Sequence, residues 1–192
     1  LSSILGFTKL ILDGLCSSPD EEHELLRDVF SSARHLLDLV NDILDLRRVE
    51  EGKLSLRVEN VNLRQLIDST LPLIAMQAAE KKLQLRNETR GQPLPLAWAD
   101  EMRVRQVLIN LLNNAVKFTP GGGRVVVRAR LDDTPDAGRP EIVLDVIDTG
   151  VGIAADEQQV VFEKFRQGKV FQKGDDAMTR EVTGTGLGLS IV

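Results

Sequence analysis

The sequence predicts an α+β protein in which a helical front part precedes a back part rich in loops and strands. Three observations lead to this fold class. Apolar residues in the first 50 positions recur at spacings of three and four, which is the helical period. Residues 121–192 hold 11 of the 15 glycines, whereas the first 50 residues hold two. Two segments rich in valine and isoleucine, 124–131 and 141–148, flank a polar turn and are typical of an antiparallel pair of strands.

The composition excludes several classes of protein. The 192 residues carry a formal charge of −5, which argues against a general nucleic-acid binder. The apolar fraction of 42% and the charged fraction of 28% are close to those of soluble globular domains. No apolar run approaches the ~20 residues of a membrane-spanning helix, and no signal peptide is visible. Cys16 is the only cysteine, so an internal disulfide is impossible and a reducing compartment fits the chain.

The front part predicts a helical hairpin. A first helix over residues 1–15 is interrupted at residues 16–20, and a second runs over 21–51, where Gly52 ends it. The second helix has the apolar spacing of packed helices, with a further row seven residues apart. These positions are Leu26, Val29, Ala33, Leu36, Val40 and Ile43, and then Phe30, Leu37 and Leu44. Because this face is broader than one helix can cover, we expect a four-helix bundle made by two chains. The alternative is a hairpin packed on the rest of its own chain.

The back part begins with shorter elements. We expect a strand over residues 53–58, a helix over 62–81 with a kink or local break at Pro72, and a strand over 83–88. A loop over 90–95 follows. Asp100 is placed to cap a helix over 101–118.

One face of the helix 101–118 carries polar side chains suited to a nucleotide. Asn110, Asn114 and Lys117 are spaced so that they share a face beside the apolar stripe. Amide oxygens suit Mg²⁺, which usually arrives with phosphates, and an ammonium group suits phosphate charge. Alone, such a face is usually ordinary solvated surface.

Three further motifs follow along the chain. Asp148 ends an apolar strand, where a carboxylate can accept a hydrogen bond from the amine of adenine, and the nearby Gly150 and Gly152 allow the backbone to approach a flat ring. Phe162 and Phe165 precede a polar segment, 166–183, and can anchor it as a flap. Residues 184–192 form a glycine-rich turn that leads into an apolar helix, whose N-terminus is a site for anions.

The order of these four motifs resembles the ATP-binding domain of sensor histidine kinases. In order along the chain, the sequence patterns of the motifs are Asn-x₃-Asn-x₂-Lys, Asp-x-Gly-x-Gly, Phe-x₂-Phe and Gly-x-Gly-x-Gly. Residues 1–7 are similar to the segment that follows the family's phosphoacceptor motif, and residues 41–53 to the end of its dimerisation hairpin. The resemblance covers essentially the whole chain.

The resemblance implies a dimerisation and phosphoacceptor hairpin over residues 1–52 and an ATP-binding domain over 53–192, built as a sandwich of helices over a mixed sheet. Such proteins use ATP and Mg²⁺, transfer the γ-phosphoryl group to a histidine of the hairpin and pass it to an aspartate of a response-regulator receiver domain. By resemblance, Asp148 binds adenine against Phe118, Asn114 with Asn110 holds Mg²⁺, and Lys117 reaches phosphate. The other implied nucleotide contacts are Gly150, Gly152, Ile153, Phe165, Arg180, Gly184, Thr185, Gly186, Leu187 and Gly188.

One position separates this chain from the related gyrase-type ATPases. They carry a glutamate as base four residues before the magnesium-binding asparagine, where this chain has Asn110. Since an amide cannot accept the proton, we expect ATP to be held without fast hydrolysis. The alternatives are an ATP-binding dimeric scaffold that transfers no phosphoryl group and a hydrolytic ATPase of the gyrase type.

The resemblance also implies segments on either side of this sequence. The acceptor histidine is expected six residues before Leu1, and neither His23 nor His35 is expected to replace it. The sequence ends within the helix that follows Gly188, so the 192 residues alone are expected to bind Mg²⁺-ATP weakly and not to label themselves. The expected location is cytoplasmic, either free or as part of a membrane-bound sensor. The expected partners are a second copy and a receiver domain, with no nucleic acid and with membrane contact only through flanking segments.

Overall fold

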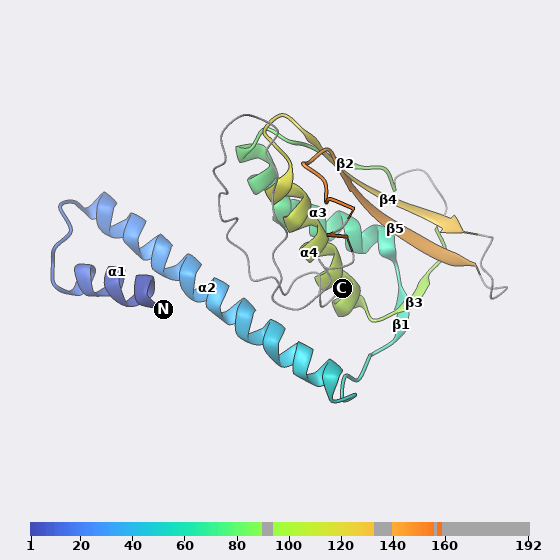
Figure 1. Ribbon diagram of the computed structural model, residues 1–192, viewed down its shortest axis with the longest axis horizontal. Coiled ribbons are helices and arrows are strands. Elements are labelled where there is room, and N and C mark those ends of the chain that lie inside the picture. The colour runs from blue at the N-terminus through green and yellow to red at the C-terminus, as the bar shows by residue number, and fades with distance from the viewer. Residues whose placement is uncertain (90–93, 133–139, 156, 159–192) are drawn as a thin grey trace. The chain divides into compact units, whose positions relative to one another are not determined.

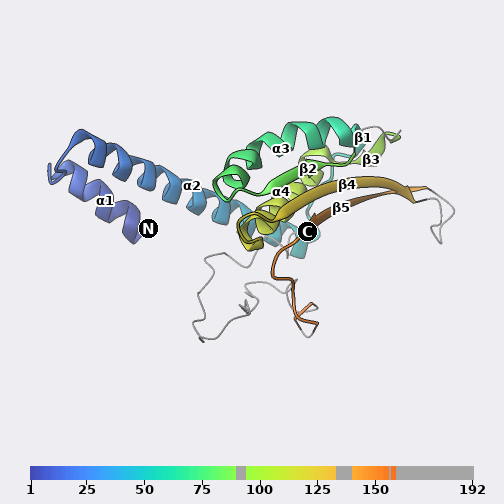
Figure 2. The same ribbon diagram turned by 90° about the horizontal axis from the view of Figure 1, so that it is seen from above.

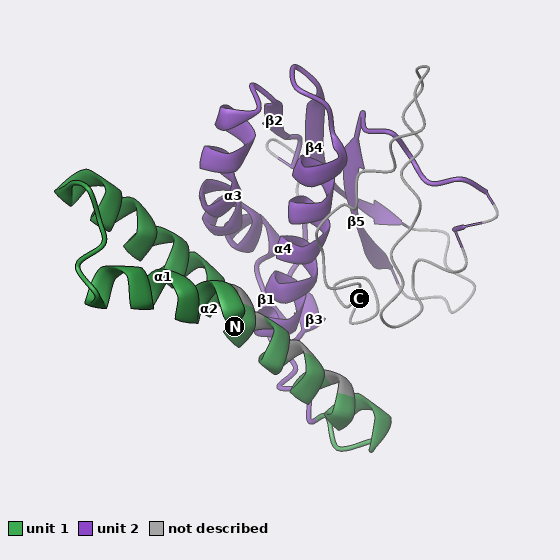
Figure 3. Ribbon diagram, turned by 60° about the vertical axis from the view of Figure 1, so that its left-hand side comes forward, with its two compact units in different colours: residues 1–54 green, residues 55–192 purple. Residues whose placement is uncertain are grey.

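The computed structural model describes residues 1–89, 94–132, 140–155 and 157–158. The chain divides into two compact units, Leu1–Leu54 and Ser55–Val192 (Figure 3). Each unit is described by itself below. In the described residues, no helix is both long and apolar enough to cross a membrane.

The first unit is the predicted helical hairpin, made of α1 (Ser2–Leu12) and α2 (Pro19–Glu50), which pack side by side (Figure 1). The side chain of Ser18 caps α2 by accepting a hydrogen bond from the backbone N–H of Glu21 at 3.2 Å. Helix α1 ends three residues earlier than predicted. The reason is Gly14, whose φ of +64° allows the backbone to turn back, so that Leu15 N–H donates to the carbonyl of Leu10.

The apolar residues of α2 form two stripes. Leu25, Val29, Leu36 and Leu39 are half-buried and lie along one side of the helix. A neighbouring stripe is exposed in the single chain and consists of Leu26, Phe30, Ala33, Leu37, Val40 and Leu44. The predicted row of packing residues thus contains members of both stripes, and the predicted flanking row, Phe30, Leu37 and Leu44, belongs to the exposed one.

The second unit contains a mixed three-stranded sheet. Strand β4 (Arg124–Asp132) lies in the middle and pairs in parallel with β2 (Gln84–Asn87) and antiparallel with β5 (Glu141–Asp148). Val127 lies opposite Val146 in the antiparallel pair. The predicted mixed sheet and the predicted antiparallel pair are confirmed.

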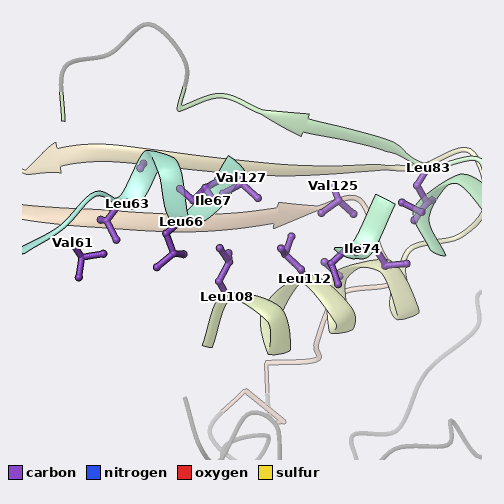
Figure 4. Close-up of a cluster of buried hydrophobic side chains, with 14 residues drawn as sticks. Val61, Leu63, Leu66, Ile67, Ile74, Leu83, Leu108, Leu112, Val125 and Val127 are labelled. Carbon is purple, nitrogen blue, oxygen red and sulfur yellow. The ribbon is translucent and has the colours of Figure 1, made fainter. Parts of the chain in front are cut away.

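Two helices, α3 (Leu63–Glu80) and α4 (Glu101–Phe118), pack against this sheet (Figure 2). Leu108 and Leu112 of α4 meet Val125 and Val127 of β4 in a cluster of fully buried side chains (Figure 4). Burial of each such side chain contributes about 1.5–3 kcal/mol, so α4 is held firmly by its apolar side.

Helix α3 continues through Pro72, so the local break, one of the two expectations there, does not occur. Buried residues lie on both sides of the proline, with Ile67 and Thr70 before it and Ile74 and Ala78 after it. Packing of both halves against the same core therefore outweighs the missing backbone donor of Pro72.

The strand predicted over residues 53–58 was wrong. The structure places a strand just beyond it, β1 (Glu59–Val61), which pairs antiparallel with β3 (Ala97–Ala99), a strand that the sequence did not predict. Each has three residues, and their pairing joins segments far apart in the chain. Neither strand is long enough to show the alternation of apolar and polar residues from which a strand is predicted.

Candidate functional site

Helix α4 is the platform of the candidate site. Its buried side chains lie toward the core, whereas Asn110, Asn114 and Lys117 are half-buried along an adjoining face. Their spacing of four and three residues places them on consecutive turns. The predicted polar face is therefore present on a helix that the core holds in place.

Asp100 fixes the N-terminus of α4, as predicted. Its Oδ1 accepts from the backbone N–H of Arg103 at 3.1 Å, and its Oδ2 accepts from the backbone N–H of Arg57 at 2.9 Å. These two N–H donors, that of Arg57 first, hold the pKa of Asp100 below its ordinary value. One carboxylate therefore joins the start of α4 to the segment that leads into β1.

Lys117 and Phe118 lie together at the C-terminal end of α4. The Nζ of Lys117 is 5.1 Å from the centre of the Phe118 ring, within the range of a cation–π contact. Burial lowers the pKa of Lys117, because the ammonium group loses part of its hydration. An anion bound beside it would offset that loss of hydration.

The loop after β5 is fastened to the same end of α4. The backbone N–H of Val151 donates to the carbonyl of Phe118 at 3.4 Å. A Cβ atom on Gly150 would lie only 2.7 Å from that carbonyl oxygen, so only glycine fits this approach. Within the loop, Oδ1 of Asp148 accepts from the N–H of Gly150 at 2.7 Å, and the Asp148 side chain is exposed. The carboxylate is thus oriented by its own loop beside Phe118.

Thr149 supplies a second attachment that the sequence did not reveal. Its Oγ1 accepts from the backbone N–H of Arg124 at 2.9 Å, and its own N–H donates to the carbonyl of Arg124 at 3.1 Å. A Cβ on Gly123 would lie 2.9 Å from Thr149 Oγ1. The loop that carries Asp148 is therefore attached both to the end of α4 and to the start of β4.

The structure thus brings together residues from two of the four motifs. The α4 face and the loop after β5 meet at Phe118 and Gly150, while Gly152 has a φ of +72° and Ile153 is exposed farther along the loop. The remaining predicted contacts lie outside the described residues: Phe165, Arg180, Gly184, Thr185, Gly186, Leu187 and Gly188.

The donor set of this region fits Mg²⁺ bound together with phosphates. Asn110 and Asn114 offer amide oxygens one turn apart. No group of three His, Cys, Asp or Glu side chains suited to a metal occurs in the part of the chain that the structure describes. Mg²⁺ usually takes few protein ligands and completes its shell with phosphate oxygens and water, so a pair of amides beside a lysine is compatible with it.

Two family models match the chain. Residues 1–52 match the His Kinase A (phospho-acceptor) domain, and residues 99–192 match the histidine kinase-, DNA gyrase B-, and HSP90-like ATPase family. The mycobacterial sensor histidine kinase MprB has a solved structure that is 30% identical, with a TM-score of 0.50, and the match covers 69% of this chain and 76% of that one. The chain belongs to the sensor histidine kinase family.

Longer proteins match the chain over nearly its whole length. Sensor protein GacS of Pseudomonas syringae pv. syringae is 37% identical over 192 residues, which are all of this chain and 20% of GacS. Full-length ShkA, solved in complex with AMPPNP, is 32% identical with a TM-score of 0.70, and the match covers 98% of this chain and 36% of ShkA. The chain therefore spans about a fifth of the length of the curated relatives it matches.

Proposed function

We propose that this chain is the catalytic core of an ATP-dependent histidine kinase of a two-component system. The observation that carries this proposal is the junction of Gly150 with Phe118, which places the Asp148 carboxylate beside the polar end of α4. A carboxylate at that point can accept the exocyclic amine of adenine, whereas guanine presents a carbonyl oxygen there. The ShkA complex shows that a related fold holds an ATP analogue.

The nucleotide would be held by groups of two kinds. The base would lie between the Asp148 loop and Phe118, with Gly150, Gly152 and the exposed side chain of Ile153 nearby. The phosphates would extend toward Lys117 and the two asparagines of α4. Phe165, Arg180 and the segment Gly184, Thr185, Gly186, Leu187 and Gly188 complete the proposed set.

Asn114, with Asn110, would hold Mg²⁺ in this site. The metal would neutralise charge on the phosphate oxygens during phosphoryl transfer. Asn110 would also make water a poor competitor, because its amide cannot accept a proton from an attacking water molecule. The bound ATP is thus reserved for a histidine nucleophile, whose phosphoryl group then passes to an aspartate of a receiver domain.

The hairpin is proposed to be the dimerisation and phosphoacceptor unit, residues 1–52, followed by the ATP-binding domain, residues 53–192. The exposed stripe of α2 supports a second copy as partner, since Phe30 and Leu37 are 68% and 60% exposed in the single chain. A heptad-spaced stripe of this kind is typical of the interface in a four-helix bundle. We place the reaction in the cytoplasm, where ATP and receiver domains meet.

Labelling with [γ-³²P]ATP tests this function. We expect the longest natural form of the protein to carry the acceptor histidine. That form should incorporate an acid-labile and alkali-stable label in the presence of Mg²⁺ and then transfer it to a receiver domain. Binding of ATP without label would favour the scaffold alternative. Rapid release of inorganic phosphate without a phosphohistidine would favour the hydrolytic alternative.

A further inference from the structure

The C-terminal end of α4 receives a side chain from a distant part of the chain. Lys81, the residue that follows α3, donates from its Nζ to the carbonyl of Val116 at 2.9 Å and to the carbonyl of Lys117 at 2.7 Å. The last four carbonyls of a helix have no partner inside the helix. An ammonium group placed there satisfies two of them and also complements the negative end of the helix dipole.

The main chain of Lys81 holds the connection that follows α4. Its carbonyl oxygen accepts from the N–H of Gly122 at 3.2 Å, and a Cβ on Gly121 would lie 3.3 Å from the same oxygen. Lys81 therefore contacts the end of α4 with its side chain and the turn into β4 with its backbone.

The next carbonyl of α4 holds the Asp148 loop. Phe118 O accepts from the N–H of Val151 at 3.4 Å, and Gly150 packs against the same peptide group. Since consecutive carbonyls of one helical turn share one backbone geometry, fixing the carbonyl of Lys117 also fixes that of Phe118. The position of the loop thus depends on the position of the group that Lys81 holds.

We propose that Lys81 is a positioning residue of the nucleotide site. It orders the turn that carries Lys117 and Phe118 and, through the carbonyl of Phe118, the loop that carries Asp148. Lys81 acts through the main chain of α4 and makes no contact with the nucleotide. This inference rests on the proposed function of that site.

Steady-state autophosphorylation by the longest natural form of the protein tests the proposal. Because a loosened site binds ATP less tightly without changing the reacting groups, Lys81→Met should raise KM for ATP about five- to tenfold with little change in kcat. Lys81→Arg, which keeps the charge and the donors, should restore most of the affinity. Lys81→Gln, which keeps a donor without the charge, should have a KM for ATP between those of the other two variants. A purely structural role would instead lower the active fraction, and with it kcat, at unchanged KM.

Lys82→Met is the matched control, since it removes the same charge from the adjacent exposed residue. It should leave KM unchanged. Asp148→Asn, measured in parallel, separates failure of the positioning role from failure of the proposed function. If Asp148→Asn raises KM and Lys81→Met does not, the positioning role is overturned and the proposed function stands. If the unmodified protein does not bind Mg²⁺-ATP, both are overturned.

Discussion

Lys82 occupies a backbone conformation that glycine occupies at the ends of the two hairpin helices. Its φ is +55°, beside +64° for both Gly14 and Gly52. In all three cases the N–H of the next residue donates a hydrogen bond to a carbonyl five residues earlier. The N–H of Leu83, for example, donates to the carbonyl of Ala78. Lys82 alone carries a Cβ atom in this conformation, which is unfavourable for any residue except glycine.

Lys82→Gly is therefore expected to stabilise the second unit. Relief of the left-handed conformation is worth about 1–2 kcal/mol, and the added freedom of glycine in the unfolded chain offsets part of it. We expect a net gain of roughly 0.5–1 kcal/mol in the free energy of unfolding, measured by urea denaturation. Lys81→Gly, made as a control one residue earlier, should lower stability, because that position is not left-handed and loses the bonds to α4. A loss of stability in Lys82→Gly would contradict this account.

Asp148 is the residue on which nucleotide recognition should depend most. Asp148→Asn replaces an acceptor with a group that can turn its own NH₂ toward the amine of adenine. A hydrogen bond to a charged group contributes about 1.5–3 kcal/mol, so the affinity for ATP should fall roughly ten- to hundredfold. Isothermal titration calorimetry measures this fall, and the melting temperature without nucleotide should change little.

Asp145→Asn controls for the loss of one charge from the same strand. Asp145 lies 3.8 Å from the Nε of Arg130 and is not among the proposed contacts, so its substitution should leave the affinity for ATP unchanged. Equal losses in the two variants would point to the net charge of the protein, and unchanged affinity in Asp148→Asn would remove Asp148 from the adenine site.

The elements with long periodic patterns could be predicted from the sequence, and the short ones could not. Helix α4 and its cap, Asp100, were found because 18 residues of helical spacing follow a capping residue. Strands β1 and β3 were missed because each has three residues and depends on a partner that is distant in the sequence. The contacts of Lys81 were missed for the same reason, since its bonds to α4 span 35 and 36 residues.

The N-cap of α4 should make the stability of the second unit depend on pH. The N–H groups of Arg57 and Arg103 lower the pKa of Asp100 from its ordinary value of 3.8, so the folded state favours the charged form. A carboxylate with a lowered pKa stabilises the fold at pH values above 3.8, and this contribution is lost as the pH falls toward the lowered value. Asp100→Asn still offers one acceptor but cannot carry the charge.

Melting temperatures of the unmodified protein and of Asp100→Asn should therefore differ at neutral pH and converge in acid. The difference should stay constant well above pH 3.8 and shrink as the pH falls below it. A difference that grows in acid would have the wrong sign and would contradict the lowered pKa. Because the cap lies at the opposite end of α4 from Phe118, the affinity of the folded variant for ATP should change less than in Asp148→Asn.

At the scale of the whole molecule, the two units present different kinds of surface. The second unit buries a continuous core between its helices and its sheet. The hairpin has no fully buried residue in α1, and the apolar stripe of α2 from Leu26 to Leu44 stays exposed in the single chain. A two-helix hairpin alone is too small to bury both apolar stripes of α2. Association with another chain would remove the exposed stripe from water.

An aspartate should have different effects in the two stripes of α2. Leu36 is half-buried in the single chain, so Leu36→Asp should destabilise the folded chain as well as the dimer. Leu37 belongs to the exposed stripe, so Leu37→Asp should leave the hairpin folded and act only on the dimer. A symmetric dimer would bury two such carboxylates, each costing more than the roughly 2–7 kcal/mol of a neutral polar group without a partner.

Light scattering at micromolar concentration, with circular dichroism on the same samples, separates these effects. The unmodified protein should be a dimer, and Leu37→Asp should be a monomer with unchanged helical content. Leu36→Asp should lose helical signal as well as association. Ser31→Asp adds a carboxylate at an exposed position of α2 outside the stripe and should remain dimeric. A monomeric unmodified protein, or a dimer that survives Leu37→Asp, would show that the exposed stripe of α2 is not the surface through which two copies meet.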